Sequence, residues 1–350
     1  MWVNTDVTAQ LNITYPIIQA GMAGSTTPEL VAAVSEAGGL GTIGAGYMSP
    51  DALKSDIRAV QRQTTAPFAV NLFVPEKVTV SDDDVAQMQA WLKPYRDAFD
   101  LQAPAVDLAS NAFHEQLDVV IETGIRIVSF TFGVPEPDVC ARLKAHGVVC
   151  IGTATSVVEA IVNEAAGMDM VVAQGSEAGG HRGCFLEDTP SIGTLSLVPQ
   201  CADAVDIPVI AAGGIADGRG LVAGLALGAD AVQVGTAFLT TDESGAHDAH
   251  KSAILNALET DTVLTRAFSG KSARGIRNAF IETMATYPGA IPPYPVQNQL
   301  TSSIRKAAAQ NNKTAWMHMW CGQSPRLTVQ QRAHDVIAKM VADASHMLSK

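Results

Sequence analysis

The chain has 350 residues, of which 47% are hydrophobic and 17% charged, and its formal net charge is −12. This composition predicts a globular protein with a sizeable core rather than a disordered chain. The acidic balance argues against a nucleic-acid partner and against an anionic membrane surface, because both require a basic face.

Short apolar runs rich in β-branched residues recur along the chain, and a stretch with helical periodicity follows most of them. Thr27-Pro28-Glu29 and Ser49-Pro50-Asp51 each predict the start of a helix, with a capping hydroxyl and a proline in the first turn. Residues 156–166 and 220–227 predict two more helices. The predicted strands, apolar on both faces as in a buried parallel sheet, are residues 16–20, 39–44, 68–73, 125–131, 148–153, 168–174, 208–212 and 229–234.

Eight strand-then-helix units in succession favour an α/β fold of the (β/α)8 TIM-barrel type over an open, flavodoxin-like sheet of six or seven strands. Two long insertions, residues 74–123 with a helix near 82–92 and residues 240–325, follow strands and so emerge at the carboxyl face of the barrel, where barrel active sites lie. We predict a barrel domain over 1–239, a lid or substrate-binding domain over 240–325, and a segment 326–350 whose helix, at 328–348, packs back on the barrel.

The residues at and just after the predicted strand ends are neutral and rich in glycine. They include no lysine placed for a Schiff base, no carboxylate pair and no set of metal ligands. A site so poor in reactive side chains takes its chemistry from a cofactor. These strand-end residues are Gly21, Met22, Ala45, Gly46, Asn71, Thr131, Thr153, Gln174, Gly175, Gly213, Gly214, Gly235 and Thr236.

Glycines that end both strand seven and strand eight predict a phosphate site. Gly213 and Gly214 end one strand just before a helix that begins near Asp217, and Gly235 with Thr236 ends the next. Glycine lets the backbone approach a ligand, helix N-terminal N–H groups favour an anion, and these two loops often hold phosphate in barrels. Tight turns alone would also explain the glycines.

The segment QGSEAGGHRG, residues 174–183, follows strand six and carries His181, which alone among the eight histidines lies near a predicted strand end. A lone loop histidine is more often solvated than catalytic, but the glycine-rich setting over an unreactive barrel mouth favours function. Glu177 either orients the imidazole or faces solvent, and we expect Arg182 to lie on the surface or fix the loop. Segment 266–278 contains four basic residues, Arg266, Lys271, Arg274 and Arg277. They either neutralise the charge of an anionic substrate or phosphate, or lie on the solvent-exposed surface of a lid.

Two further features bear on the compartment. The five cysteines are scattered, with no Cys-x-x-Cys pair, which indicates a reducing environment rather than a disulfide framework. Residues 1–16 carry no basic stretch before an apolar run, and charge, glycine or proline interrupts each apolar segment. We therefore expect a cytoplasmic protein without signal peptide or membrane span.

Nearly the whole chain resembles the nitronate monooxygenase family, formerly the 2-nitropropane dioxygenases, and its class I members in particular. The Gly-Gly-His motif with its flanking Gln and Glu is the specific signal, since a glycine pair on strand seven occurs in many phosphate-binding barrels. The matching segments are YPIIQAGM (15–22), PFAVNLF (67–73), SFTFG (129–133), VAQGSEAGGHRG (172–183), AAGGI (211–215), DGRG (217–220) and SGKSARG (269–275).

The resemblance implies an FMN cofactor. The backbone of Ala20, Gly21 and Met22 would flank the flavin ring, Asn71 and Gln174 would hydrogen-bond it, and the glycine-rich loop would lie against it. His181 matches the family's active-site histidine. The remaining residues that the resemblance assigns to FMN, chiefly to its phosphate, are Gly179, Gly180, Gly213, Gly214, Gln233, Gly235 and Thr236.

The implied reaction is the oxidation of an alkyl nitronate, of the propionate 3-nitronate type, by O₂ to a carbonyl compound and nitrite through a flavin semiquinone. As an imidazolium, His181 would stabilise the anionic nitronate, a role consistent with the absence of another cation among the predicted strand-end residues. As a neutral base, it would instead take the α-proton of a nitroalkane. We favour the first role at this stage. The partners implied are a small nitronate and O₂, with a homodimer left open.

The chain departs from the family pattern at four positions. Gly21 stands where many members have proline, and Thr131 where relatives with an SFHFG motif have histidine. Tyr294 matches a family tyrosine, whereas Asn298 and Ser302 stand where close relatives have tyrosine and lysine. The substrate-side residues are thus Thr131, Tyr294, Asn298 and Ser302, and the departures at three of them, all but Tyr294, leave the substrate open. Two alternatives to the nitronate reaction remain: an NAD(P)H-dependent FMN reductase of quinones or enoyl thioesters, and a non-catalytic FMN- or phosphate-binding barrel.

Overall fold

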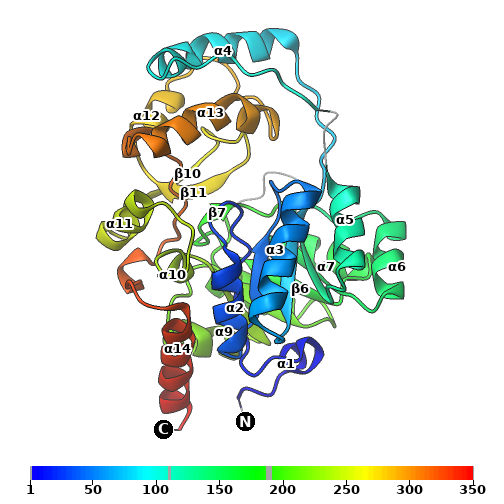
Figure 1. Ribbon diagram of the computed structural model, residues 1–350. Coiled ribbons are helices and arrows are strands. Elements are labelled where there is room, and N and C mark those ends of the chain that lie inside the picture. Colours follow the sequence, from blue (N-terminus) through cyan, green and yellow to red (C-terminus); the bar gives the residue numbers. More distant parts are fainter. Residues whose placement is uncertain (1, 109–111, 187–190, 350) are drawn as a thin grey trace.

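The computed structural model describes residues 2–108, 112–186 and 191–349, and its centre is a parallel sheet of eight strands curled into a barrel (Figure 1). All eight predicted strands are confirmed, with ends that differ from the prediction by at most two residues. In spatial order the strands are β1 (Ile17–Gln19), β9 (Ala231–Val234), β8 (Val209–Ala212), β6 (Met170–Gln174), β5 (Val149–Ala154), β4 (Ile127–Thr131), β3 (Phe68–Phe73) and β2 (Gly41–Gly44).

The first and last strands of this order meet, so the sheet is a barrel and not an open layer. Ile18 and Leu40 form a parallel bridge, and Leu40 exchanges backbone hydrogen bonds of 2.9 Å with Ile17 and Gln19. The strands are buried almost throughout, as the apolar runs predicted. The (β/α)8 prediction is therefore confirmed over the flavodoxin-like alternative.

Helices on the outside of the barrel bury its apolar surface. Thr27 and Ser49 cap the helices predicted after them, and Ser156 and Asp217 cap the other two. No helix within the described ranges is long and apolar enough to cross a bilayer. The helices of the barrel are α1 (Asp6–Leu11), α2 (Pro28–Glu36), α3 (Pro50–Gln63), α5 (Phe113–Glu122), α6 (Pro137–Ala145), α7 (Val157–Ala165), α8 (Thr194–Ala202), α9 (Gly218–Ala226) and α10 (Thr236–Leu239).

The C-terminal helix α14 (Ala333–Leu348) packs against α2 and α9, as predicted, but it begins five residues later than expected. A short 3-10 helix, Pro325–Leu327, and an extended stretch precede it. The carboxylate of Glu243 accepts the N–H of Ala333 at 2.9 Å. A side chain from a distant part of the chain thus caps the helix, which local sequence does not reveal.

The two insertions together form a layer over the carboxyl ends of the strands (Figure 1). Helix α4 (Asp82–Asp97), from the first insertion, shares one apolar cluster with α12 (Ala279–Ala285) and α13 (Val296–Gln310) from the second. We call α4 together with residues 262–316 the lid. The lid thus includes a helix outside the predicted 240–325 unit, and the domain boundaries at 239 and 325 stay a prediction. The second insertion also holds α11 (Asp248–Asn256), β10 (Thr262–Thr265), β11 (Ala273–Ile276) and the 3-10 helix Thr314–Trp316.

Replacing Phe280 with alanine is expected to destabilise the lid by about 3–5 kcal/mol, because it empties the centre of this cluster. Phe280 is fully buried, stacks on Phe268 at 4.7 Å, and meets Tyr95 of α4 edge-on at 5.0 Å. Urea unfolding measures the loss. The control is Leu258→Ala, at a side chain that is 48% exposed, and a loss below about 1 kcal/mol for Phe280→Ala would contradict this packing.

Candidate active site

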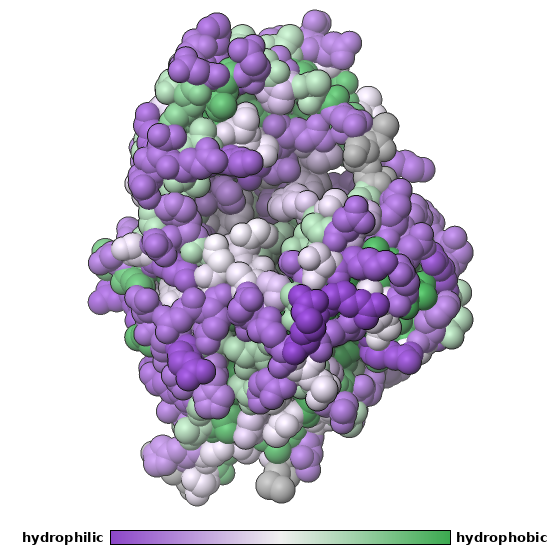
Figure 2. All heavy atoms as spheres, viewed as in Figure 1, coloured by the Kyte–Doolittle hydropathy of each residue, from purple (hydrophilic) through white to green (hydrophobic). Residues whose placement is uncertain are grey.

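A cavity of about 510 Å³ lies between the strand ends and the lid, a volume typical of small-molecule and cofactor sites. Figure 2 shows a hollow between the upper and lower parts of the molecule, on an otherwise largely hydrophilic face. The cavity lining includes every residue that the sequence assigned to FMN: Ala20, Gly21, Met22, Asn71, Gln174, Gly179, Gly180, Gly213, Gly214, Gln233, Gly235 and Thr236.

The predicted substrate-side residues divide into two groups. Thr131, Asn298 and Ser302 line this cavity. Tyr294 instead lines a neighbouring cavity of about 250 Å³, although its ring lies 6.2 Å from that of His181 and 5.3 Å from that of Phe132. Tyr294 therefore forms part of the partition between the two cavities.

The loop after β8 presents bare backbone to the cavity. Gly213 and Gly214 have φ angles of 115° and 71°, a region that side chains other than glycine rarely adopt. Within the described residues, the N–H of Gly214 has no protein acceptor. The following helix offers an anion fewer free donors than expected, because the Asp217 carboxylate accepts the N–H groups of Arg219 and Gly220 at the start of α9. An anion would have to use the glycine loop.

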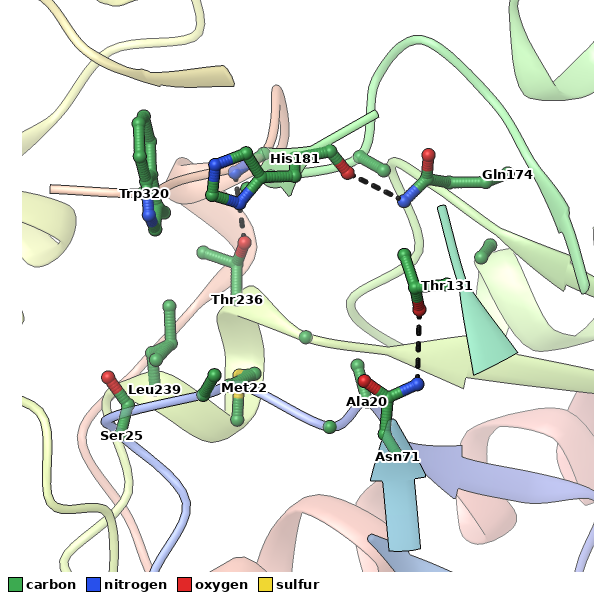
Figure 3. Close-up of a pocket in the computed structure, with 18 of the residues that line it drawn as sticks. Ala20, Met22, Ser25, Asn71, Thr131, Gln174, His181, Thr236, Leu239 and Trp320 are labelled. Carbon is green, nitrogen blue, oxygen red and sulfur yellow. Dashed lines mark hydrogen bonds between the residues drawn. The ribbon is translucent and has the colours of Figure 1, made fainter. Parts of the chain in front are cut away.

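The floor of the cavity is polar and closely fitted around Asn71. Its Nδ2 donates to Ser129 Oγ at 3.0 Å and to Thr131 Oγ1 at 3.1 Å (Figure 3). A Cβ atom added at Gly21 would lie 2.6 Å from the Cβ of Asn71. Glycine at position 21 is thus required by the placement of Asn71 in this chain.

Gln174 holds the histidine loop against the end of β6. Its Oε1 accepts the N–H of Gly183 at 2.9 Å and its Nε2 donates to the carbonyl of His181 at 3.1 Å (Figure 3). Both polar atoms of this side chain therefore have protein partners. Its predicted hydrogen bond to a flavin stays a prediction.

The two charged residues of this loop fix its shape and do not touch the imidazole. Glu177 accepts the N–H and hydroxyl of Thr194, at 2.8–2.9 Å, at the start of α8. Arg182 is buried and donates to the carbonyl of Gly175 at 2.5 Å. Neither option considered for Glu177 is correct, whereas the loop-fixing option for Arg182 is.

His181 belongs to a strand that joins the barrel to the lid. Residues Gly180–His181 form β7, which pairs with β11, so that His181 lies opposite Ala273. Its Nε2 lies 2.8 Å from Ser269 Oγ, which in turn donates to the carbonyl of Lys271 at 3.1 Å. With the serine hydrogen directed to that carbonyl, His181 Nε2 donates to Ser269 Oγ and Nδ1 is the basic atom of the ring.

The environment of His181 keeps its ring neutral. Burial, followed by the positive charges of Arg305 and Lys271, lowers the pKa of His181 to about 3. The rings of Phe132 and Trp320 lie 5.6 and 5.3 Å away, and no carboxylate is among the groups that shift its pKa. This environment favours the neutral-base role of His181 over the imidazolium role that we preferred from the sequence.

Three histidines inside the fold, at or beside the cavity, make the stability of the fold depend on pH. Burial lowers the pKa of His181, His250 and His318 below the ordinary 6.5. The unfolded chain therefore binds protons that the folded chain does not, and stability present above pH 6.5 is lost as the pH falls from there. We expect His318→Gln to flatten this fall in unfolding free energy between pH 7 and 4. A variant with the wild-type slope would contradict the neutral state of His318.

The sequence analysis did not identify the side chains that the second insertion, residues 240–325, and the loop after β2 bring to the cavity. The most consequential is Arg305 of α13, three residues after Ser302 and seven after Asn298, and so on the same helix face. That spacing was a usable signal. The other lining residues missed include Tyr47, His250, His318, Trp320, Gly322 and Ser324.

The basic segment 266–278 does not supply the cation of this cavity. Lys271 pairs with Glu76 and lies over the ring of Phe132 at 4.7 Å. Arg274 is buried and donates from Nε to the carbonyl of Ser176 at 2.8 Å. Of the described residues that line the cavity, Arg305 carries its permanent positive charge.

Comparison with known proteins agrees with this arrangement. The model of the family described as nitronate monooxygenase matches residues 4–343. The chain belongs to the nitronate monooxygenase family. It is 56% identical to a probable nitronate monooxygenase of Staphylococcus saprophyticus and 53% identical to one of Staphylococcus aureus strain Newman, with 100% and 99% of both chains covered, respectively.

Solved structures extend the likeness to the whole fold. Nitroalkane oxidase from Streptomyces ansochromogenes superimposes with a TM-score of 0.91 at 39% identity, over 98% of this chain and 99% of that one. FabK from Thermotoga maritima gives 0.80 at 33% identity, over 99% and 98%. This member of the nitronate monooxygenase family is thus an oxidoreductase on a TIM barrel.

Proposed function

We propose that this chain binds FMN and catalyses the oxidation of alkyl nitronates by O₂ to a carbonyl compound and nitrite. The observation that carries the proposal is the cavity itself, in which all twelve predicted FMN residues and His181 meet at the strand ends. Membership of the nitronate monooxygenase family supports the reaction class.

The residues present fit an FMN molecule. Gly213 and Gly214 adopt left-handed backbone that keeps the loop after β8 free of side chains, and a Cβ at Gly235 would meet nothing closer than 3.8 Å. These backbones would hold the phosphate. Asn71 and the backbone of residues 20–22 would hold the ring system against the floor. When bound, FMN would supply the electron-accepting group that no side chain of the cavity provides.

The side chains around it would prepare the substrate. Neutral His181 would take the α-proton of a nitroalkane at Nδ1, with Ser269 fixing the ring through Nε2. For a nitronate, which has already lost that proton, His181 would act as a neutral polar neighbour. The rings of Phe132, which is buried, and Trp320, which is partly buried, would exclude water from the reacting end of the cavity. The Streptomyces neighbour, a nitroalkane oxidase, supports acceptance of the neutral form as well.

Nitrite release from propyl 1-nitronate in air tests the proposal. The FMN-loaded protein is expected to release nitrite in step with oxygen uptake. Anaerobic mixing with NADH addresses the reductase alternative, in which the flavin would bleach rapidly; we expect slow or no bleaching. A yellow protein that releases no nitrite and does not react with NADH would instead favour the non-catalytic alternative.

A further inference from the structure

Arg305 is a partly buried cation that the fold leaves without a counter-ion. Its Nη2 donates to the carbonyl and to Oδ1 of Asn298, at 2.9 and 2.7 Å, and its Nε has no hydrogen-bond partner within the described chain. The ionisable groups that act on its charge are the phenols of Tyr47 and Tyr294, which burial keeps neutral by raising their pKa, and no carboxylate is among them. Burying a guanidinium without a counter-ion is energetically costly, and a bound anion would remove this cost by pairing with its charge.

The position of Arg305 places that anion at the reacting end of the cavity. Arg305 lines the same cavity as His181, and its charge is felt by both His181 and His318. The glycine loops expected to hold the FMN phosphate belong to the barrel, whereas Arg305 belongs to α13 of the lid. The guanidinium thus faces the substrate side of the site.

We propose that Arg305 binds the anionic head group of the substrate and makes the enzyme selective for the ionised nitronate over neutral ligands of the same shape. This inference rests on the proposed function. A nitronate carries its charge on two oxygens in one plane, which matches the planar fork of a guanidinium. Because His181 is neutral, Arg305 supplies the positive charge that stabilises the anion, including the anion that forms when His181 removes a proton. Asn298 acts as its positioning residue through Oδ1.

The test uses FMN-loaded enzyme and butyrate, an unreactive anion with the shape of propyl 1-nitronate, with butyramide as the neutral probe. For Arg305→Gln we expect the Kd of butyrate, measured by calorimetry, and the KM for propyl 1-nitronate to rise about 10- to 100-fold, with butyramide unchanged. Arg305→Lys, which keeps the charge but lacks the planar fork, should recover only part of the loss, and Asn298→Ala should cause a smaller loss than Arg305→Gln. Arg326→Gln, at an exposed arginine paired with Glu259, is the matched control.

Unchanged butyrate binding in Arg305→Gln would overturn the proposal, as would an equal loss of butyramide binding. Loss of FMN from this variant would also overturn it, because the guanidinium would then belong to the cofactor site. Failure of the proposed function shows itself differently, as a wild-type enzyme that releases no nitrite. The butyrate comparison still reports on Arg305 in that case.

Discussion

Replacing His181 with asparagine is expected to lower turnover of 1-nitropropane by about 10²- to 10⁴-fold, the range typical of a general base. The Nδ1 atom that would accept the α-proton is lost, while FMN content and fold should remain. Turnover of propyl 1-nitronate, which needs no proton removal, should fall much less. Steady-state nitrite release with both substrates measures the difference.

The matched control is His334→Asn, at an exposed histidine beside Asp335, which should leave both rates unchanged. Equal losses with both substrates would reject the base role, and wild-type turnover in His181→Asn would reject any catalytic role. The pH dependence of kcat/KM tests the protonation state of His181 independently, because a pKa near 3 leaves its ring neutral from pH 5 to 8. The kcat/KM for propyl 1-nitronate should then show no fall attributable to His181 in this range, whereas a required imidazolium would impose one.

Replacing Gly235 with leucine should abolish FMN binding without unfolding the barrel. Gly235 has an ordinary φ of −111°, so its backbone accepts a side chain. Its Cβ would point into the cavity, with Ala20 and Met22 as its nearest neighbours at 3.8 and 4.0 Å. A leucine there would occupy the space expected for the cofactor and displace its phosphate from the loop. We expect the Kd for FMN to rise at least about 100-fold, as measured by flavin fluorescence quenching.

Ala290→Leu, at an exposed alanine in the second insertion, serves as the control and should bind FMN normally. Thermal unfolding should show that both variants stay folded. Wild-type affinity in a folded Gly235→Leu protein would mean that the cofactor does not lie against the loop after β9.

The sequence was sufficient for the barrel and its floor because both depend on local signals. Eight apolar runs with capped helices between them specify the strands, and parallel strands carry their ends to a common face. That is why residues as distant as Asn71 and Gly235 could be assigned to one cavity. The family resemblance added the expectation that the cofactor is FMN.

The lid could not be read in the same way, because its residues reach the site through tertiary packing. Helix α4 packs in one apolar cluster with α12 and α13, which lie about two hundred residues further along the chain. No local sequence pattern predicts that contact. The protonation state of His181 depends on tertiary packing for the same reason. Its pKa is set by burial and by Arg305 and Lys271, which only the folded lid brings close.

The flavin content of the purified protein tests the central claim most directly. The account predicts a yellow protein that releases equimolar FMN, and no FAD, on denaturation, or that takes up FMN to that level on reconstitution. A colourless protein that cannot be reconstituted with FMN would contradict it.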